Sequence, residues 1–126
     1  MIAHLDHLVL TVEDIPRTVA FYTTVLGMRE VTFGEGRTAL AFGNQKINLH
    51  QHGRELEPKA TFPTRGSADL CFIASIPLED VIAQLNEHSV PILQGPIQRT
   101  GAVGPIRSIY LRDPDSNLIE VSNYLG

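Results

Sequence analysis

Four side chains that can bind a metal stand at matched places in the two halves of this 126-residue sequence. His7 and Asp69 lie in the first apolar run of each half, and His50 and Glu120 lie in the last run of each half. Two imidazoles and two carboxylates suit a borderline or harder divalent ion, such as Mn, Fe, Co, Ni or Zn. The pattern predicts one such ion per site, and an octahedral ion would keep two positions for water or substrate.

Each of these residues also has a simpler explanation when it is taken alone. A histidine on a strand is usually a surface or hydrogen-bonded residue, Asp69 could lie at the edge of a turn, and Glu120 could face solvent. His52 competes with His50, because residues two apart on a strand share a face. His50 is preferred, since His52 is followed by Gly53, where the strand is expected to end. The metal hypothesis depends on the joint placement of the four residues.

The elements that would position these side chains repeat in order. In the first half, residues 5–12 are rich in β-branched and apolar residues, which favours a strand. Asp14 is a suitable N-cap, Pro16 is tolerated in a first helical turn, and Gly27 is placed to end the helix. Shorter strands are expected at residues 28–33, 38–42 and 46–50.

The second half is expected to follow the same β-α-β-β-β order after a polar connector at residues 53–66. A strand at residues 68–74 precedes a helix that begins after Pro77, and the later strands are expected at residues 90–93, 108–111 and 118–121. If the first and last strands of each half are neighbours, His7 can lie beside His50 and Asp69 beside Glu120. The sequence therefore predicts one domain over residues 1–126, with module 1 at about 1–52 and module 2 at about 67–126.

Composition narrows the class of protein. The chain is 43% hydrophobic and carries a net charge of −4, so we expect a folded globular domain with no nucleic-acid partner. No apolar stretch approaches the roughly 20 residues of a membrane span, so no membrane partner is expected. Cys71 is the one cysteine and cannot form an internal disulfide, which favours a reducing compartment, the cytoplasm.

Several segments together resemble the glyoxalase/fosfomycin-resistance/dioxygenase superfamily, also called the vicinal-oxygen-chelate superfamily. The segments are Asp6-His7, Ala20-Phe21-Tyr22, Val25-Leu26-Gly27-Met28, Arg112-Asp113-Pro114-Asp115 and Asn117-Leu118-Ile119-Glu120. Further similarity at residues 45–50 and 99–110 points to the branch of glyoxalase domain-containing proteins. The resemblance implies an α+β fold in which two βαβββ modules form an eight-stranded, cup-shaped mixed sheet. It also implies that His7 and Glu120 are the first and last metal ligands.

The resemblance implies a metal-dependent enzyme of the glyoxalase-like lyase or isomerase type, or of the dioxygenase type. A small substrate would chelate the ion through two neighbouring oxygens, and Glu120 is the candidate catalytic residue, with Asp69 as a second candidate for the base. Thr11 stands where glyoxalase I carries an arginine that holds glutathione, which argues against that substrate. Ser116 stands in a turn where glycine is common, so it is expected to adopt a strained backbone.

The remaining expectations concern the substrate and the assembly. Arg37 and Arg107, together with Tyr110, are the candidate substrate-binding residues, although the simpler explanation, which is favoured for both arginines, is a solvent-facing strand charge. Residues 96–105 could form a lid over the cup or a plain long loop. The modules are expected to pair in a homodimer. The alternative function is a metal-free module of the same fold that sequesters small molecules.

Overall fold

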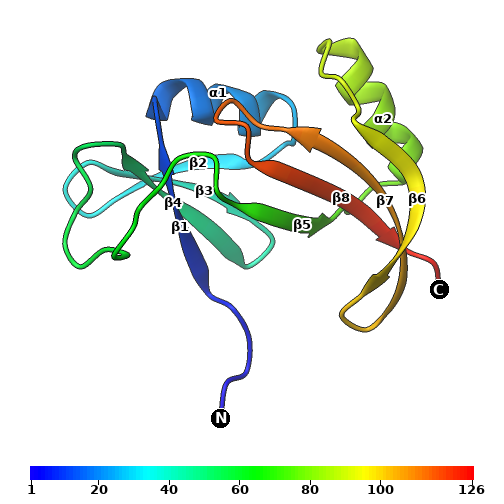
Figure 1. Cartoon of the computed structure of the whole chain (residues 1–126), viewed down its shortest axis with the longest axis horizontal. Helices are drawn as coiled ribbons and strands as arrows, with labels where there is room; N and C mark the ends of the chain where they lie inside the picture. The colour runs from blue at the N-terminus through cyan, green and yellow to red at the C-terminus, as the bar shows by residue number, and fades with distance from the viewer. The chain divides into compact units, whose positions relative to one another are not determined.

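Two βαβββ modules follow each other in the computed structural model, which describes all 126 residues (Figure 1). The first comprises β1 (His7–Val12), α1 (Ile15–Thr24), β2 (Arg29–Phe33), β3 (Arg37–Phe42) and β4 (Gln45–Gln51). The second comprises β5 (Asp69–Ile73), α2 (Leu78–Glu87), β6 (Gln94–Gly101), β7 (Gly104–Arg112) and β8 (Leu118–Tyr124). The chain divides into two units, Met1–Gly66 and Ser67–Gly126, with one module in each. The predicted α+β class and module order are confirmed.

Each unit contains one four-stranded mixed sheet, with the strand orders β1-β4-β3-β2 and β5-β8-β7-β6. The first and last strands of each module are parallel neighbours, and the other pairs are antiparallel. Since these two strands point in the same direction, the chain between them must cross over, and the helix is part of that connection. The expectation that the first and last strands of each half lie side by side is confirmed.

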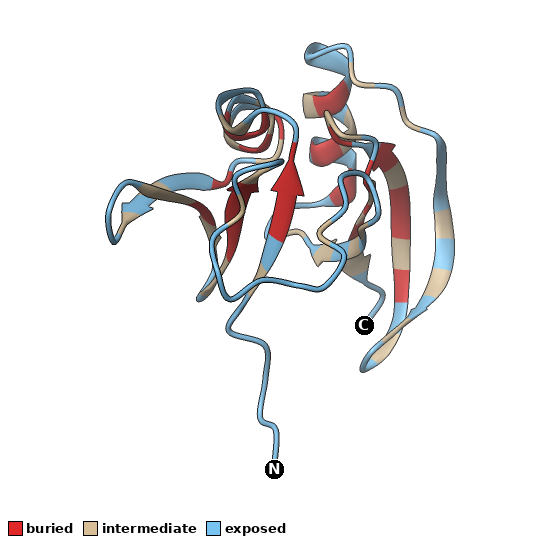
Figure 2. Cartoon of the chain, turned by 60° about the vertical axis from the view of Figure 1, so that its left-hand side comes forward, coloured by how far each residue is buried: buried red, intermediate tan, exposed pale blue.

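Alternation along the strands places one face of each sheet against its helix. In the first unit, Leu10 and Leu40 are buried on the face that packs against Tyr22 of α1. In the second unit, Leu85 of α2 and Ile119 of β8 are fully buried. Burying such a side chain stabilises the fold by about 1.5–3 kcal/mol. Figure 2 shows buried residues on the helices and on the strands of both units.

The ends of α1 follow the sequence prediction in position. Asp14 has the extended backbone of an N-cap residue, although its side chain makes no capping hydrogen bond, and proline stands at the start of the helix. Gly27 has a φ of +70°, which most L-residues avoid, so it can turn the chain from the helix toward β2. Ser116, in the turn before β8, has a φ of +67°. The strained, left-handed backbone expected at this position is therefore confirmed.

The strand pattern of the second module differs from the prediction in one place. Residues 90–93 are not a strand, and residues 96–105, which were expected to be a lid or a loop, belong mainly to the β6–β7 hairpin. Gly95 and Pro96 fall at a register shift between Gln94 and Ile97. A proline is tolerated there because β6 is an edge strand. Residues 96–105 are therefore mainly strand in this structure, where a lid or a plain long loop was expected.

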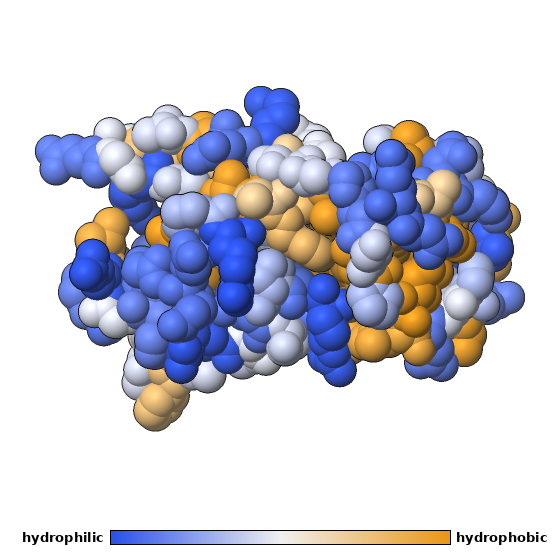
Figure 3. Space-filling view, turned by 90° about the horizontal axis from the view of Figure 1, so that it is seen from above, coloured by the Kyte–Doolittle hydropathy of each residue, from blue (hydrophilic) through white to orange (hydrophobic).

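The face seen in Figure 3 mixes hydrophilic and hydrophobic residues, with hydrophobic groups gathered over the second unit, on the right of the view. Neither α1 nor α2, each of 10 residues, is long and apolar enough to cross a membrane.

Candidate functional site

The sheet face of the first unit that points away from α1 carries most of its polar side chains. His7 on β1 and Asn48 and His50 on β4 share this face, because parallel neighbours that are paired in register point the same way. Asn48 is 4% exposed and His50 is 5% exposed, so both are held within the fold. His7 is more open, with a side chain that is 44% exposed.

The register places His7 and His50 apart. His7 lies opposite Lys46, whereas His50 lies opposite Thr11, four residues further along the same pair of strands. Four residues of an extended strand span about 13 Å. The expectation that His7 lies beside His50 is therefore wrong. Alternation of strand faces determined that the two histidines share a face, but it does not specify how far apart they lie along it.

Lys46 lies directly opposite His7, and Asn48 is the next residue of β4 on the same face. It stands opposite Val9, two residues after His7, and the second unit repeats this arrangement with Glu120 opposite Cys71, two residues after Asp69. The structural equivalent of Glu120 is thus Asn48. The expected alignment of His50 with Glu120 is displaced by two residues. Sequence reasoning missed Asn48 because an asparagine between two apolar residues gives no strong metal signal.

Two side-chain atoms in the first unit are suited to binding a ligand. The His7 ring Nδ1 lies 2.8 Å from Oδ1 of Asp6, which orients the ring and directs Nε2 outward. The buried Oδ1 of Asn48 has no hydrogen-bond partner, and leaving a buried polar atom unsatisfied costs roughly 1–3 kcal/mol. Nε2 of His7 and Oδ1 of Asn48 are both suitable ligand atoms for a divalent cation.

His50 has a different environment. Nη2 of Arg37 donates a hydrogen bond to Nε2 of His50 over 3.4 Å, so the lone pair of this nitrogen is already used. Burial, and then the nearby Arg37 cation, lower the pKa of the His50 imidazole below its ordinary value. Arg37 and Lys46 also lie against the ring of Phe33, at 4.8 and 3.6 Å from its centroid. The Arg37 cation beside His50 disfavours a second cation at that end of the face, and Lys46, the register partner of His7, adds positive charge at the other end.

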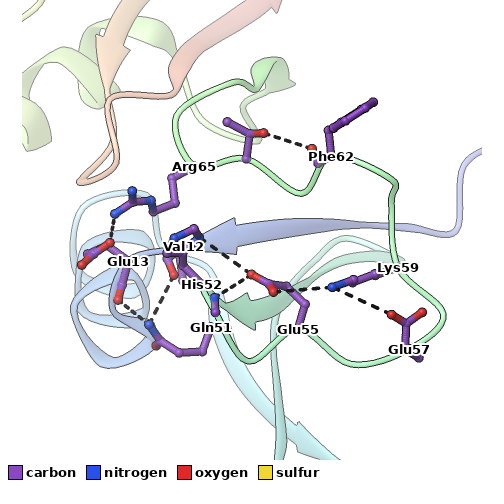
Figure 4. A network of polar contacts seen from close by, with 11 residues as sticks. Val12, Glu13, Gln51, His52, Glu55, Glu57, Lys59, Phe62 and Arg65 are labelled. Carbon is purple, nitrogen blue, oxygen red and sulfur yellow. Dashed lines mark hydrogen bonds and ion pairs between the residues drawn. The ribbon is translucent and has the colours of Figure 1, made fainter.

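His52 lies outside β4, in a polar network that joins the connector to the first module (Figure 4). Its Nδ1 is 3.8 Å from Glu55, whose carboxylate also lies 4.0 Å from Nζ of Lys59. Arg65 forms an ion pair with Glu13 in the same network. These contacts give His52 a structural role at the strand end.

In the second unit, the sheet face away from α2 carries Asp69, Cys71, Tyr110 and Glu120. Glu120 lies opposite both Cys71 on β5 and Tyr110 on β7. Neither Asp69 nor Glu120 forms an ion pair, so both carboxylates are available. Partial burial, and then the negative charge of Glu120, raise the pKa of the Cys71 thiol. A protonated thiol is a poor nucleophile at neutral pH, which makes Glu120 the stronger candidate for proton transfer.

A pocket of about 390 Å³ opens on this face of the second unit. Glu120, Tyr110 and Cys71 line it together with Arg99 of β6, while Ile73 and Ile106 supply apolar surface. This volume falls in the range of small-molecule sites, roughly 300–1,000 Å³. Tyr110, a candidate substrate-binding residue, lines this pocket. Arg99 was missed because its hairpin was read as a loop.

Arg107 does not belong to this pocket. It neighbours Ser108 on β7 and therefore points to the opposite face, where its Nη1 lies 2.5 Å from the carboxylate of Glu79 on α2. Arg107 is thus a partly exposed strand charge that pairs with α2, away from the pocket that Tyr110 lines. Arg37 remains on the polar face of the first unit.

The modules and the polar sheet faces define a glyoxalase-like protein, and a family model agrees. Residues 4–121 match the Glyoxalase/Bleomycin resistance protein/Dioxygenase superfamily, so the chain belongs to this superfamily. In neither unit do three or more His, Cys, Asp or Glu side chains gather closely enough to hold a metal ion.

Three relatives are similar over nearly the whole chain. The virulence protein STM3117 of Salmonella typhimurium is 58% identical over 125 residues, which are 99% of this chain and 87% of the relative, and its crystal structure gives a TM-score of 0.97. The glyoxalase domain-containing protein RDO1 of Mycosarcoma maydis is 58% identical over 95% of this chain and 68% of its own length. The structure VPC_CASS1 from the mobile metagenome of V. Pseudocholerae is 60% identical, with a TM-score of 0.97 over 100% of this chain and 98% of the other.

More distant structures share the fold alone. A lactoylglutathione lyase from Agrobacterium tumefaciens, at 21% identity, has a TM-score of 0.72, and the fosfomycin resistance protein FosX from Listeria monocytogenes, crystallised with Mn(II), has 0.67. TnmS3, an antibiotic-binding protein from Streptomyces, has a TM-score of 0.74 at 19% identity. Structures of this fold therefore include a lactoylglutathione lyase, a fosfomycin resistance protein crystallised with Mn(II) and an antibiotic-binding protein.

Proposed function

We propose that this protein is a divalent-metal-dependent enzyme that acts on a small substrate with two neighbouring oxygens. The observation that carries the proposal is the repeated diagonal pair, His7 with Asn48 in one unit and Asp69 with Glu120 in the other. Each pair occupies the same two register positions, on the sheet face that points away from the helix of its unit. A duplicated fold that repeats ligand-capable residues in this way is typical of a site with pseudo-twofold symmetry.

The donor set suits a divalent cation of the group Mn, Fe, Co, Ni and Zn. His7 would bind through Nε2, and Asp69 and Glu120 through carboxylate oxygens. The fourth ligand comes from β4: the sequence pattern proposes His50, and the register favours Asn48, whose Oδ1 is buried and unsatisfied. Uniting the two pairs at one ion, within one chain or between two copies, is part of the proposal.

The ion would supply Lewis acidity and hold the substrate oxygens. The chain's own residues would do the rest. Glu120 lines the pocket and would accept a proton from the substrate carbon through a carboxylate oxygen and later return it. Ile73 and Ile106 would limit the access of water to that carboxylate. This chemistry covers glyoxalase-like lyases and isomerases, and a dioxygenase would use the same ligands. The single Cys71 supports a cytoplasmic location as part of the proposal.

The decisive experiment is a metal-binding assay on protein purified without a His-tag. Each of the five divalent ions is added to the metal-free protein, and binding is measured by calorimetry and, for Mn²⁺, by electron paramagnetic resonance. Binding of about one ion per site is expected, with large losses in His7→Ala and Glu120→Gln. Protein that binds none of the five ions would overturn the proposal.

Matched variants on β4 identify the fourth ligand. Asn48→Ala should weaken binding more than His50→Ala, because Nε2 of His50 already accepts the hydrogen bond from Arg37. The control is His52→Ala, which alters only the network beyond the strand. A larger loss in His50→Ala than in Asn48→Ala would restore His50 as the ligand.

The pocket also favours a second candidate function, a metal-free module that sequesters a small molecule. Tyr110 and Tyr124 line it, and aromatic rings can stack on flat ligands. Only 6% of residues are aromatic, however, and no tryptophan is present. Absence of metal binding together with tight binding of a flat ligand would select this function.

A further inference from the structure

Arg99 is the one cationic residue that lines the pocket, and it has no counter-ion in the protein. It lies on β6, half-buried, on the face shared with Ile106, which is its register partner on β7. Arg65 and Arg107 form ion pairs with Glu13 and Glu79, but Arg99 forms none. A cation in a pocket without a protein counter-ion is suited to an anionic ligand.

The orientation of Arg99 is set by Tyr110. Nε of Arg99 donates a hydrogen bond to the Tyr110 hydroxyl over 3.0 Å, and the guanidinium carbon lies 5.7 Å from the centre of the Tyr110 ring. These contacts use one of the five N–H donors of the side chain. The two terminal amino groups have no partner in the protein. They are the donors that form paired hydrogen bonds with two oxygens of a carboxylate, phosphate or phosphonate.

The rest of the pocket defines where such an anion must sit. Glu120 lines the same pocket and forms no ion pair with Arg99, which leaves room for ligand atoms between the two charges. An anionic group close to Glu120 would be repelled by its carboxylate. The anion should therefore bind at the Arg99 end, while the reacting carbon lies toward Glu120.

We propose that Arg99, held by Tyr110, binds an anionic oxygen group of the substrate, a carboxylate or a phosphonate-type group. The inference rests on the proposed function for the role of Glu120, and it makes that function more specific. The substrate would be a small acid, with its vicinal oxygens on one side and its anionic group on the other. Neutral hydroxy-ketones and catechols would be poor substrates.

Binding of small anions tests this inference without knowledge of the substrate. Malonate and phosphonoacetate are titrated by calorimetry into metal-free and Mn²⁺-loaded protein, and uncharged malonamide is the matched neutral probe. The Nε–H resonance of Arg99 is followed by NMR in the same titrations. Binding of an acid with a shift of this resonance is expected, and the stronger probe distinguishes a carboxylate site from a phosphonate site. Equal binding of malonamide would overturn the inference.

Variants of Arg99 and Tyr110 measure how much each residue contributes to the affinity for the acid. Arg99→Gln should weaken acid binding about ten- to a hundredfold, as expected for loss of a charge-assisted hydrogen bond. Arg99→Lys should recover part of the loss, and Tyr110→Phe should cost less than Arg99→Gln because it removes only the orienting acceptor. Arg107→Gln is the control, since Arg107 pairs with Glu79 on the other face. Thermal unfolding of each variant shows whether the fold is kept.

The outcomes separate the two proposals. Metal binding that persists in Arg99→Gln, with acid affinity equal to that of the unchanged protein, overturns the role of Arg99 and leaves the proposed function standing. Loss of acid binding in Arg99→Gln in a protein that binds no metal supports the anion site and overturns the proposed function.

Discussion

Arg37 and His50 form a hydrogen-bonded pair on the polar face of the first unit, with 3.4 Å between Nη2 and Nε2. Because an arginine nitrogen can only donate, Nε2 must accept, and the imidazole is then neutral with its proton on Nδ1. His50 is 5% exposed. The hydrogen bond requires a neutral His50, because protonation of the imidazole would place its positive charge beside that of Arg37.

The first prediction is that stability falls as the pH is lowered through the range in which an unfolded histidine titrates. Burial and the Arg37 cation lower the pKa of folded His50, so below about pH 6.5 the unfolded chain binds the proton first. The stabilisation is complete above pH 6.5 and is lost as the pH falls toward the folded pKa. Urea unfolding between pH 8 and 5 measures this change. His50→Gln should flatten the profile, and His52→Gln should not. An unchanged slope in His50→Gln would contradict the prediction.

The second prediction concerns the Cys71 thiol. Partial burial, and then the Glu120 carboxylate, raise its pKa, although the residue as a whole is exposed. Since only the thiolate reacts, alkylation by iodoacetamide at pH 8 should be slower than that of a free thiol, and Glu120→Gln should make it faster. The rate is followed by mass spectrometry, with Glu79→Gln as a control on the other side of the sheet. Equal rates in the two variants would show that Glu120 does not act on the thiol.

The third prediction concerns the two serines with a positive φ. Ser116 has a φ of +67° and Ser89 has a φ of +57°. A left-handed backbone costs an L-residue about 1–2 kcal/mol, and the greater unfolded-state freedom of glycine offsets part of the gain. Ser116→Gly and Ser89→Gly should each stabilise the protein by about 0.5–1 kcal/mol in urea unfolding. Ser75→Gly, at an exposed position without a positive φ, should not stabilise it.

The fourth prediction is little or no turnover of the methylglyoxal–glutathione hemithioacetal. Thr11 is 7% exposed and shares the face of His7, and the family resemblance places the glutathione-holding arginine of glyoxalase I at this position. Losing that charge-assisted contact should reduce the rate about ten- to a hundredfold, because remote binding energy orients the reacting carbon. Thioester absorbance is followed with the metal-loaded protein. A kcat/KM of about 10⁴ M⁻¹s⁻¹ or more would identify a true glyoxalase I.

The fifth prediction is a homodimer. Each module holds only two of the four proposed ligands, and pairing of modules from two copies is one way to complete each site. Light scattering at micromolar concentration should give about twice the 13.9 kDa chain mass. A particle of the single-chain mass would contradict the prediction, and the ligands would then have to come from one chain.

Sequence by itself determined the elements and the faces of this protein. The positions of Asp14, Pro16 and Gly27 predicted α1, because capping and backbone preferences act within a few residues. The turn before β8 was predicted to strain Ser116 for the same local reason. Alternation along the strands placed His7 and His50 on one face, since side-chain direction repeats every two residues.

Only the tertiary structure decided which residues meet. A strand can slide past its neighbour by two residues without changing the face of any side chain, so alternation left open which residue of β4 lies beside His7. The β1–β4 register places Lys46 opposite His7, with Asn48 two residues and His50 four residues further along the same face. In the same way, the β6–β7 pairing brought Arg99 to Tyr110, and the packing of α2 drew Arg107 to Glu79. Register and helix packing arise from long-range hydrogen bonds and apolar burial, which no local pattern of residues encodes.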